Sequence, residues 1–212
     1  MRKRKKVILS IFLLISVLII YIFFNYTLVD KCTQKGTIGI IDTNLSRQYD
    51  NVIYNSTNSV NYSNKKTHGD SIINFINDLN FNGNIYYYSA LSSNNTIDSE
   101  SIIEGLNWML NNNIHTVNIS LSSKYYSEDI QKWINNHPEV NIYASYNNNY
   151  NDKYDYPAMY EKVIASGTDK RIHYKKIDKK YRNNKLIIVN SSIKYYHGNS
   201  YLSILTMIKG DD

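Results

Sequence analysis

The 212-residue chain has a single cysteine, Cys32, and this scarcity excludes two kinds of site. One thiol cannot form an internal disulfide, and it cannot supply the several ligands of a cysteine-based metal cluster. Cys32 directly follows Lys31, which is a poor setting for lipid attachment, so we interpret it as a passive thiol. Asp152 and Asp155 could ligate an ion, but solvated loop charges explain them more simply. We therefore expect neither a metal nor another cofactor.

The folded part of the chain also lacks an excess of basic side chains. Of the 24 Lys and Arg residues, five lie at 2–6, which leaves 19 against 18 Asp and Glu elsewhere. A nucleic-acid-binding domain is expected to carry a basic stripe on its folded body. We therefore expect no nucleic-acid partner, and we interpret the basic cluster as a signal of membrane topology.

A long apolar run follows the basic cluster. Residues 7–24 contain only three polar interruptions, and a bilayer-spanning helix needs about 20 mostly apolar residues. A cleavable signal peptide has a shorter apolar core and a small-residue cleavage site, and no Ala-x-Ala follows here. A cleaved signal is the alternative. The sequence predicts a basic cytoplasmic tail at 1–6, a transmembrane signal anchor at 7–26, a linker at 27–36 and an extracytoplasmic domain at 37–212 of a single-pass cell-membrane protein.

Short β-branched or aromatic runs alternate with amphipathic patterns across this domain. Near-continuous apolar runs are typical of strands buried on both faces, and they occur at 37–42, 84–91, 115–121, 140–146, 162–168 and 185–190. Core-facing apolar stripes predict helices at 70–79, 101–112 and 127–136. Ser101 and Glu104 have the spacing of a capping box. The alternation predicts an α/β fold with a parallel sheet that is flanked by helices on both faces.

Three polar residues fall where such a sheet places its sites. Asp42 ends the first predicted strand, His68 opens the first helical pattern, and Ser200 opens the last apolar run. Each alone is typical of a turn or a helix cap. Sites of parallel sheets lie beyond the carboxyl ends of the strands. Together, the three residues have the chemistry of nucleophilic catalysis, because an imidazole can take the hydroxyl proton and a carboxylate can orient the imidazole.

The motifs around these residues, in the order Asp, His, Ser, resemble those of the subtilases, the subtilisin-like serine proteases. The resemblance covers residues 37–209. The segment IGIIDTN resembles the strand that ends in the catalytic Asp, and THGDSIINFI resembles the His-Gly-Thr-His motif, with Asp70 in place of Thr. HGNSYLSILTM resembles Gly-Thr-Ser-Met-Ala-x-Pro, with Ile204 near the place of Pro.

The resemblance implies a role for each matching residue. Asp42, His68 and Ser200 would form the catalytic triad, and the Asn147 side-chain amide would join the Ser200 N–H as oxyanion donor. Asn148 follows Asn147, and we expect its replacement to have little effect. The residues that would line the substrate by strand pairing are Leu121, Ser122 and Ser123.

Two functions are compatible with these residues. The first is a membrane-anchored extracytoplasmic serine endopeptidase that cleaves a peptide or protein substrate through an acyl-enzyme, with an exported peptide as a candidate substrate. The second is a catalytically impaired subtilase-like protein that binds peptides or confers immunity. The changed motif residues, such as Asp70 and Ile204, favour the second, and the intact triad favours the first. The sequence predicts no oligomeric state.

Overall fold

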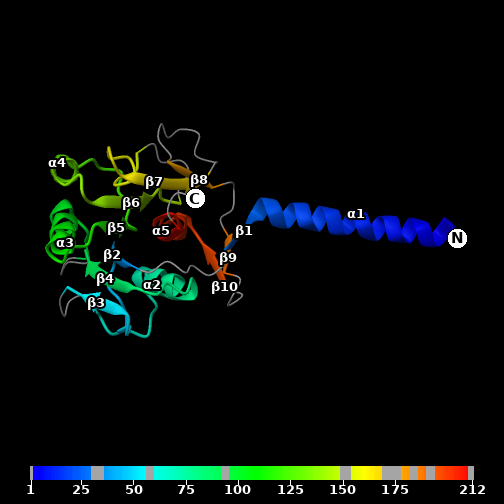
Figure 1. Ribbon diagram of the computed structural model, residues 1–212, viewed down its shortest axis with the longest axis horizontal. Helices are drawn as coiled ribbons and strands as arrows, with labels where there is room; N and C mark the ends of the chain where they lie inside the picture. Colours follow the sequence, from blue (N-terminus) through cyan, green and yellow to red (C-terminus); the bar gives the residue numbers. More distant parts are fainter. Residues whose placement is uncertain are drawn as a thin grey trace.

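The structure is a computed structural model, and it describes residues 2–29, 36–55, 60–91, 96–148, 154–168, 178–181, 186–189 and 194–209. Its main body is a seven-stranded sheet in the order β3-β4-β2-β5-β6-β7-β8, in which all neighbouring strands are parallel (Figure 1). The strands are β2 (Thr37–Asp42), β3 (Val52–Tyr54), β4 (Asn84–Ser89), β5 (Thr116–Ile119), β6 (Asn141–Ser145), β7 (Ile164–Thr168) and β8 (Lys179–Tyr181). Their carboxyl ends therefore lie along one edge of the sheet.

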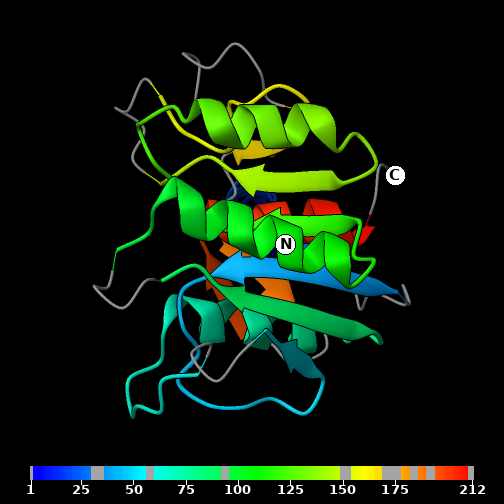
Figure 2. The ribbon, with the colours of Figure 1, turned by 90° about the vertical axis from the view of Figure 1, so that its left-hand side faces the viewer.

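Two pairs of helices cover the two faces of this sheet. In Figure 2, α3 (Ser99–Asn111) and α4 (Glu128–Asn136) lie in front of the sheet, and α2 (His68–Asp78) and α5 (Asn199–Lys209) lie behind it. One apolar core contains side chains of α3 and α4, and a second contains those of α2 and α5. The predicted α/β architecture with helices on both faces is confirmed.

The predicted strand at 185–190 is present, but it belongs to a second sheet. This sheet has the order β1-β9-β10 and consists of β1 (Tyr26–Val29), β9 (Leu186–Val189) and β10 (Lys194–His197). Strand β1 runs parallel to β9, and the Val29 side chain is buried in the same core as Ile187. The predicted linker over 27–36 thus begins with three residues, 27–29, that pair with β9.

Helix α1 (Arg2–Asn25) precedes β1 and extends away from the body of the chain in Figure 1. Its side chains are exposed from Val7 to Ile22. Among the residues that the structure describes, no helix combines the length and the apolarity needed to cross a membrane. The signal anchor predicted over 7–26 stays a prediction, and its last residue, Tyr26, belongs to β1.

Helix α3 begins earlier than its pattern predicts, because Asp98 and not Ser101 is its N-cap. The Asp98 carboxylate accepts the N–H of Ser101 at 2.8 Å, and the Ser101 hydroxyl returns a contact to the backbone of Asp98. The predicted capping box of Ser101 and Glu104 is wrong. Glu104 instead accepts a hydrogen bond from the Tyr88 hydroxyl at 3.0 Å, so its side chain ties α3 to β4.

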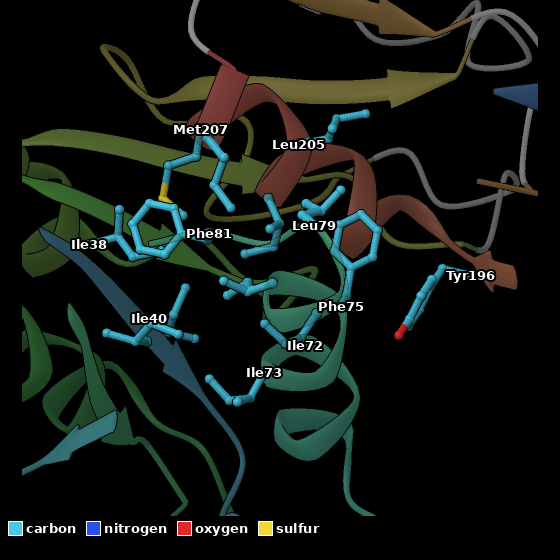
Figure 3. Close-up of a cluster of buried hydrophobic side chains, with 14 of the residues drawn as sticks. Ile38, Ile40, Ile72, Ile73, Phe75, Leu79, Phe81, Tyr196, Leu205 and Met207 are labelled. Atoms are coloured by element: carbon cyan, nitrogen blue, oxygen red, sulfur yellow. The ribbon is translucent and has the colours of Figure 1, made fainter. Parts of the chain in front are cut away.

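The core behind the sheet fixes the position of α5. Figure 3 shows Leu205 and Met207 of α5 among side chains of α2, such as Phe75, and of β2, such as Ile40. Every residue of α5 from Leu202 to Ile208 is buried. Burial of a large apolar side chain stabilises a protein by about 1.5–3 kcal/mol, so α5 is firmly held against the sheet.

Candidate active site

Asp42 lies at the carboxyl end of β2, which is the third strand from one edge of the seven-stranded sheet. Its side chain is fully buried, and its two oxygens lie 2.8 and 2.9 Å from Nδ1 of His68. The N–H of Thr43 donates to the same carboxylate at 2.6 Å. A buried carboxylate needs such partners because desolvation of an unpaired charge is costly. The sequence-predicted pair of Asp42 and His68 is thus brought together.

His68 is the first residue of α2, and its side chain is 41% exposed. Burial lowers the pKa of His68, but the hydrogen bond and the negative charge of Asp42 outweigh it and raise the pKa above the ordinary value of 6.5. A contact at Nδ1 leaves Nε2 to face a reactant. The ring is therefore oriented by a buried carboxylate and still reachable, as a general base requires.

Asp70, which departs from the subtilase motif, fixes the loop that carries His68. Its carboxylate accepts the backbone N–H of Thr67 at 2.7 Å and that of Ser46 at 3.1 Å, while Tyr49 donates its hydroxyl at 3.1 Å. Thr67 and Asp70 form a reciprocal capping box at the start of α2. Burial raises the pKa of Asp70, but the hydrogen bonds from Ser46 and Thr67 outweigh burial and lower the pKa below 3.8. These contacts explain why an Asp can stand at position 70, where the subtilase motif has Thr.

Ser200 lies in the first turn of α5 and is half-buried. Polar contacts tie its helix to the sheet: Asn118 of β5 donates to the Ser203 hydroxyl at 2.5 Å, and the hydroxyls of Ser166 and Thr206 are 2.9 Å apart. Ring contacts join α5 to α2, with centroids of Phe75 and Tyr201 5.1 Å apart.

His68 and Ser200 therefore stand at the starts of two helices that pack against each other on one face of the sheet. Among the described residues, the Ser200 hydroxyl makes no hydrogen bond to His68. Catalytic hydrogen bonds are often long before the substrate is bound, so this geometry does not exclude the pair.

The turn after β6 reaches the start of α5 through two asparagines. The Asn147 carbonyl accepts the side-chain amide of Asn199 at 3.0 Å, and the Asn148 side-chain oxygen accepts the Asn199 backbone N–H at 3.0 Å. The structure thus brings the predicted oxyanion residue Asn147 to the Ser200 helix by its backbone. The side chain that contacts this helix start is that of Asn148.

Asn148 and Gly198 are site residues that sequence reasoning missed. Gly198 has a φ of +128°, and a Cβ atom there would lie 3.2 Å from the Asn148 side-chain nitrogen. The Gly-x-Ser pattern of residues 198–200 is a sequence signal that could have identified Gly198 as a site residue. Asn147 and Asn148 are adjacent in a run of asparagines, so no sequence signal separates them.

The segment 121–123 lies beside a pocket of about 480 Å³. Ser123 and Tyr156 form an antiparallel bridge in which each backbone N–H donates to the other residue's carbonyl, at 2.8 and 2.7 Å. These two bonds use the N–H and the carbonyl of Ser123, and the strand pairing of 121–123 with a substrate that the resemblance implies stays a prediction.

The pocket is mainly apolar and aromatic. The rings of Tyr156 and Tyr160 are tilted against each other with centroids 4.8 Å apart, and Tyr126 meets the Tyr156 ring edge-on at 5.4 Å. Tyr126 is 55% exposed and stands at the pocket rim. The three predicted substrate-lining residues all contribute to the wall, which is completed by other residues including Ile97, Ile102, Ile130 and Pro157.

Solved structures share this arrangement of sheet and helices. The psychrophilic subtilisin-like protease Apa1 from the Antarctic psychrotroph Pseudoalteromonas sp. AS-11 matches with a TM-score of 0.54 and 21% identity, over 71% of this chain and 40% of Apa1. The prenylagaramide maturation protease PagA matches with a TM-score of 0.55 and 13% identity, over 81% of this chain and 72% of PagA. The chain has a subtilisin-like fold.

The self-cleaved protease domain of PatA has the same fold, with a TM-score of 0.54 and 13% identity over 80% of this chain and 76% of that domain. No protein-family model matches the sequence, and no curated protein matches it significantly. Because the identities are low, the likeness concerns the subtilisin-like fold, and the roles of individual residues rest on the geometry above.

Proposed function

We propose that this chain is a serine endopeptidase that cleaves a peptide through an acyl-enzyme formed on Ser200. The observation that carries the proposal is the contact of the buried Asp42 carboxylate with Nδ1 of His68 at 2.8 Å. It holds the imidazole at the carboxyl edge of a subtilisin-like sheet, on the face against which the Ser200 helix packs.

In this proposal His68 takes the proton of the Ser200 hydroxyl as the oxygen attacks the scissile carbonyl. Asp42 keeps Nδ1 protonated and stabilises the imidazolium that forms. The Ser200 N–H and a side-chain amide of the Asn147–Asn148 turn stabilise the developing oxyanion. The protonated ring then donates its proton to the leaving amine, and water releases the acyl group by the reverse sequence.

The pocket beside 121–123 supports an extended peptide as the substrate. An extended peptide can lie along 121–123, and the adjoining apolar pocket can accept one of its side chains. PagA and PatA, whose folds are similar, are a maturation protease and a self-cleaved protease. A small exported peptide is therefore our candidate substrate.

Covalent labelling with a fluorophosphonate tests the proposal on the purified full-length chain. We expect one phosphonyl group on Ser200, no labelling of Ser200→Ala, and strongly reduced labelling of His68→Ala, because the hydroxyl then keeps its proton. Circular dichroism of each variant checks that it is folded. A folded wild-type chain that does not react would reject the endopeptidase.

The second candidate is a catalytically impaired peptide-binding protein. It is favoured by the missing hydrogen bond between Ser200 and His68 among the described residues. If this candidate is correct, the folded chain binds a peptide in the pocket beside 121–123, which Tyr126 lines, and the fluorophosphonate does not label it. The extracytoplasmic location remains a prediction from residues 2–24, and protease treatment of intact cells would test it.

A further inference from the structure

Asp155 is a fully buried acidic residue whose position the sequence did not indicate. The sequence predicts that Asp155 is a solvated loop charge. In the structure, the Asp155 carboxylate instead points into the protein, where Oδ2 accepts the backbone N–H of Asn147. A buried carboxylate is costly unless it is hydrogen-bonded, and charge-assisted bonds are about twice as strong as neutral ones. The backbone of Asn147 is thus held by a strong contact from a residue eight positions further along the chain.

Contacts on both sides of Asp155 connect the pocket edge to the Ser200 helix. On one side, the neighbouring residue Tyr156 is fixed to Ser123 by two backbone hydrogen bonds of 2.8 and 2.7 Å. On the other side, Asn147 accepts the Asn199 side chain at 3.0 Å, one residue before Ser200. A displacement at the Asn147 N–H therefore reaches the start of α5 through one further hydrogen bond.

We propose that Asp155 is a positioning residue that fixes the Asn147–Asn148 turn against the N-terminus of the Ser200 helix. It does not touch the reacting atoms, and it acts through Asn147 and Asn199. The inference rests on the proposed function for its effect on reactivity. Misplacement of a catalytic constellation by about 1 Å can cost about 100-fold in rate, so loss of this contact should slow the reaction of Ser200.

A purely structural role makes a different prediction. If Asp155 only stabilised the fold, its removal would lower the fraction of chains that can be labelled and leave the rate constant of the folded fraction unchanged. If Asp155 is a positioning residue, its removal lowers the maximal rate constant of labelling. The fluorophosphonate concentration that gives half of this rate stays unchanged, and labelling still goes to completion. These readouts separate the two roles.

The variants are Asp155→Ala, which removes the acceptor, and Asp155→Asn, whose amide oxygen can still accept the Asn147 N–H. The matched control is Asp178→Ala, because the Asp178 carboxylate also accepts a backbone N–H, that of Ala165 at 2.8 Å near the start of β7. Each is made in the full-length chain. Labelling kinetics and hydrogen–deuterium exchange of peptides that cover 146–148 and 198–201 are measured.

For Asp155→Ala we expect faster exchange in both peptides and a maximal labelling rate reduced by about 10- to 100-fold. Asp155→Asn should recover most of that rate, and Asp178→Ala should match the wild type in both measurements. Unchanged exchange in Asp155→Ala, or an unchanged maximal rate, would overturn the inference. A wild-type chain that is not labelled at all would instead reject the proposed function, and the exchange results would then decide the role of Asp155 alone.

Discussion

The buried carboxylate of Asp42 is in contact with Nδ1 of His68, 26 residues further along the chain. This contact joins the end of a strand in the middle of the sheet to the first residue of α2, and it determines the protonation behaviour of the imidazole. Burial lowers the pKa of His68, but the hydrogen bond and the charge of Asp42 outweigh burial and raise the pKa above 6.5. The pH dependence of the reaction follows from this balance.

We expect the labelling rate of Ser200 to rise with pH and to reach half its maximum above pH 6.5, because only neutral His68 can accept the hydroxyl proton. Asp42→Asn should lower the rate by about 10⁴-fold, as loss of this group does in a serine-protease triad. It should also move the midpoint to lower pH, because the charge that favours imidazolium is gone. A midpoint that stays in place would contradict the assigned contact.

Replacement of Asn148 should affect the site, although the sequence predicted little effect. Asn148→Ala removes the acceptor of the Asn199 N–H, and loss of a comparable helix cap costs about 0.5–2 kcal/mol. We expect a lower melting temperature and slower labelling. Asn148→Asp keeps an acceptor but has no N–H group, so it should recover the stability. If it recovers the labelling rate as well, the Asn148 amide does not stabilise the oxyanion.

Asn147→Ala tests the other oxyanion assignment. Loss of one such donor raises the barrier by about 2.7–4 kcal/mol, which corresponds to a rate about 100- to 1,000-fold lower. The backbone contacts of Asn147 with Asp155 and Asn199 remain in this variant, so its melting temperature should change little. Exposed Asn135, on α4, supplies the control Asn135→Ala. A normal rate in Asn147→Ala would leave Asn148 as the candidate donor.

Asp70 should make the stability of the fold depend on pH. Its pKa is below 3.8 in the folded chain, so its contribution is present above that pH and is lost as the pH falls through the folded-state pKa. Asp70→Ala leaves the N–H groups of Ser46 and Thr67 without this acceptor, which costs about 1–3 kcal/mol for a buried group. Thermal unfolding at several pH values should show the largest difference from the wild type at neutral pH, and the difference should shrink in acid.

Gly198 should not tolerate a side chain. Gly198→Ala places a Cβ at a φ of +128° and 3.2 Å from the Asn148 amide, and a backbone held in a rare conformation costs about 1–3 kcal/mol. We expect lower stability and slower labelling. Gly36→Ala is the matched control, because a Cβ at Gly36 would meet no atom within 4 Å. Equal stability of the two variants would contradict the geometry of the turn before Ser200.

The sequence by itself determined the α/β architecture of this chain and the juxtaposition of Asp42 and His68. Apolar runs such as 37–42 became strands and the stripe at 70–79 became a helix, because burial follows the period of each element. Asp42 and His68 could be paired in advance, since strand ends and helix starts meet at one edge of a parallel sheet.

Only the tertiary structure decided which polar groups meet at that edge. The run 185–190 has the composition of a central strand, yet its described residues, 186–189, pair with β1 and β10, because apolar composition does not specify a neighbour. Asn147 and Asn148 have the same side chain, and only their contacts with Asn199 distinguish them. Asp155 has the sequence signature of a loop charge, and it is buried because the fold brings the Asn147 N–H to it.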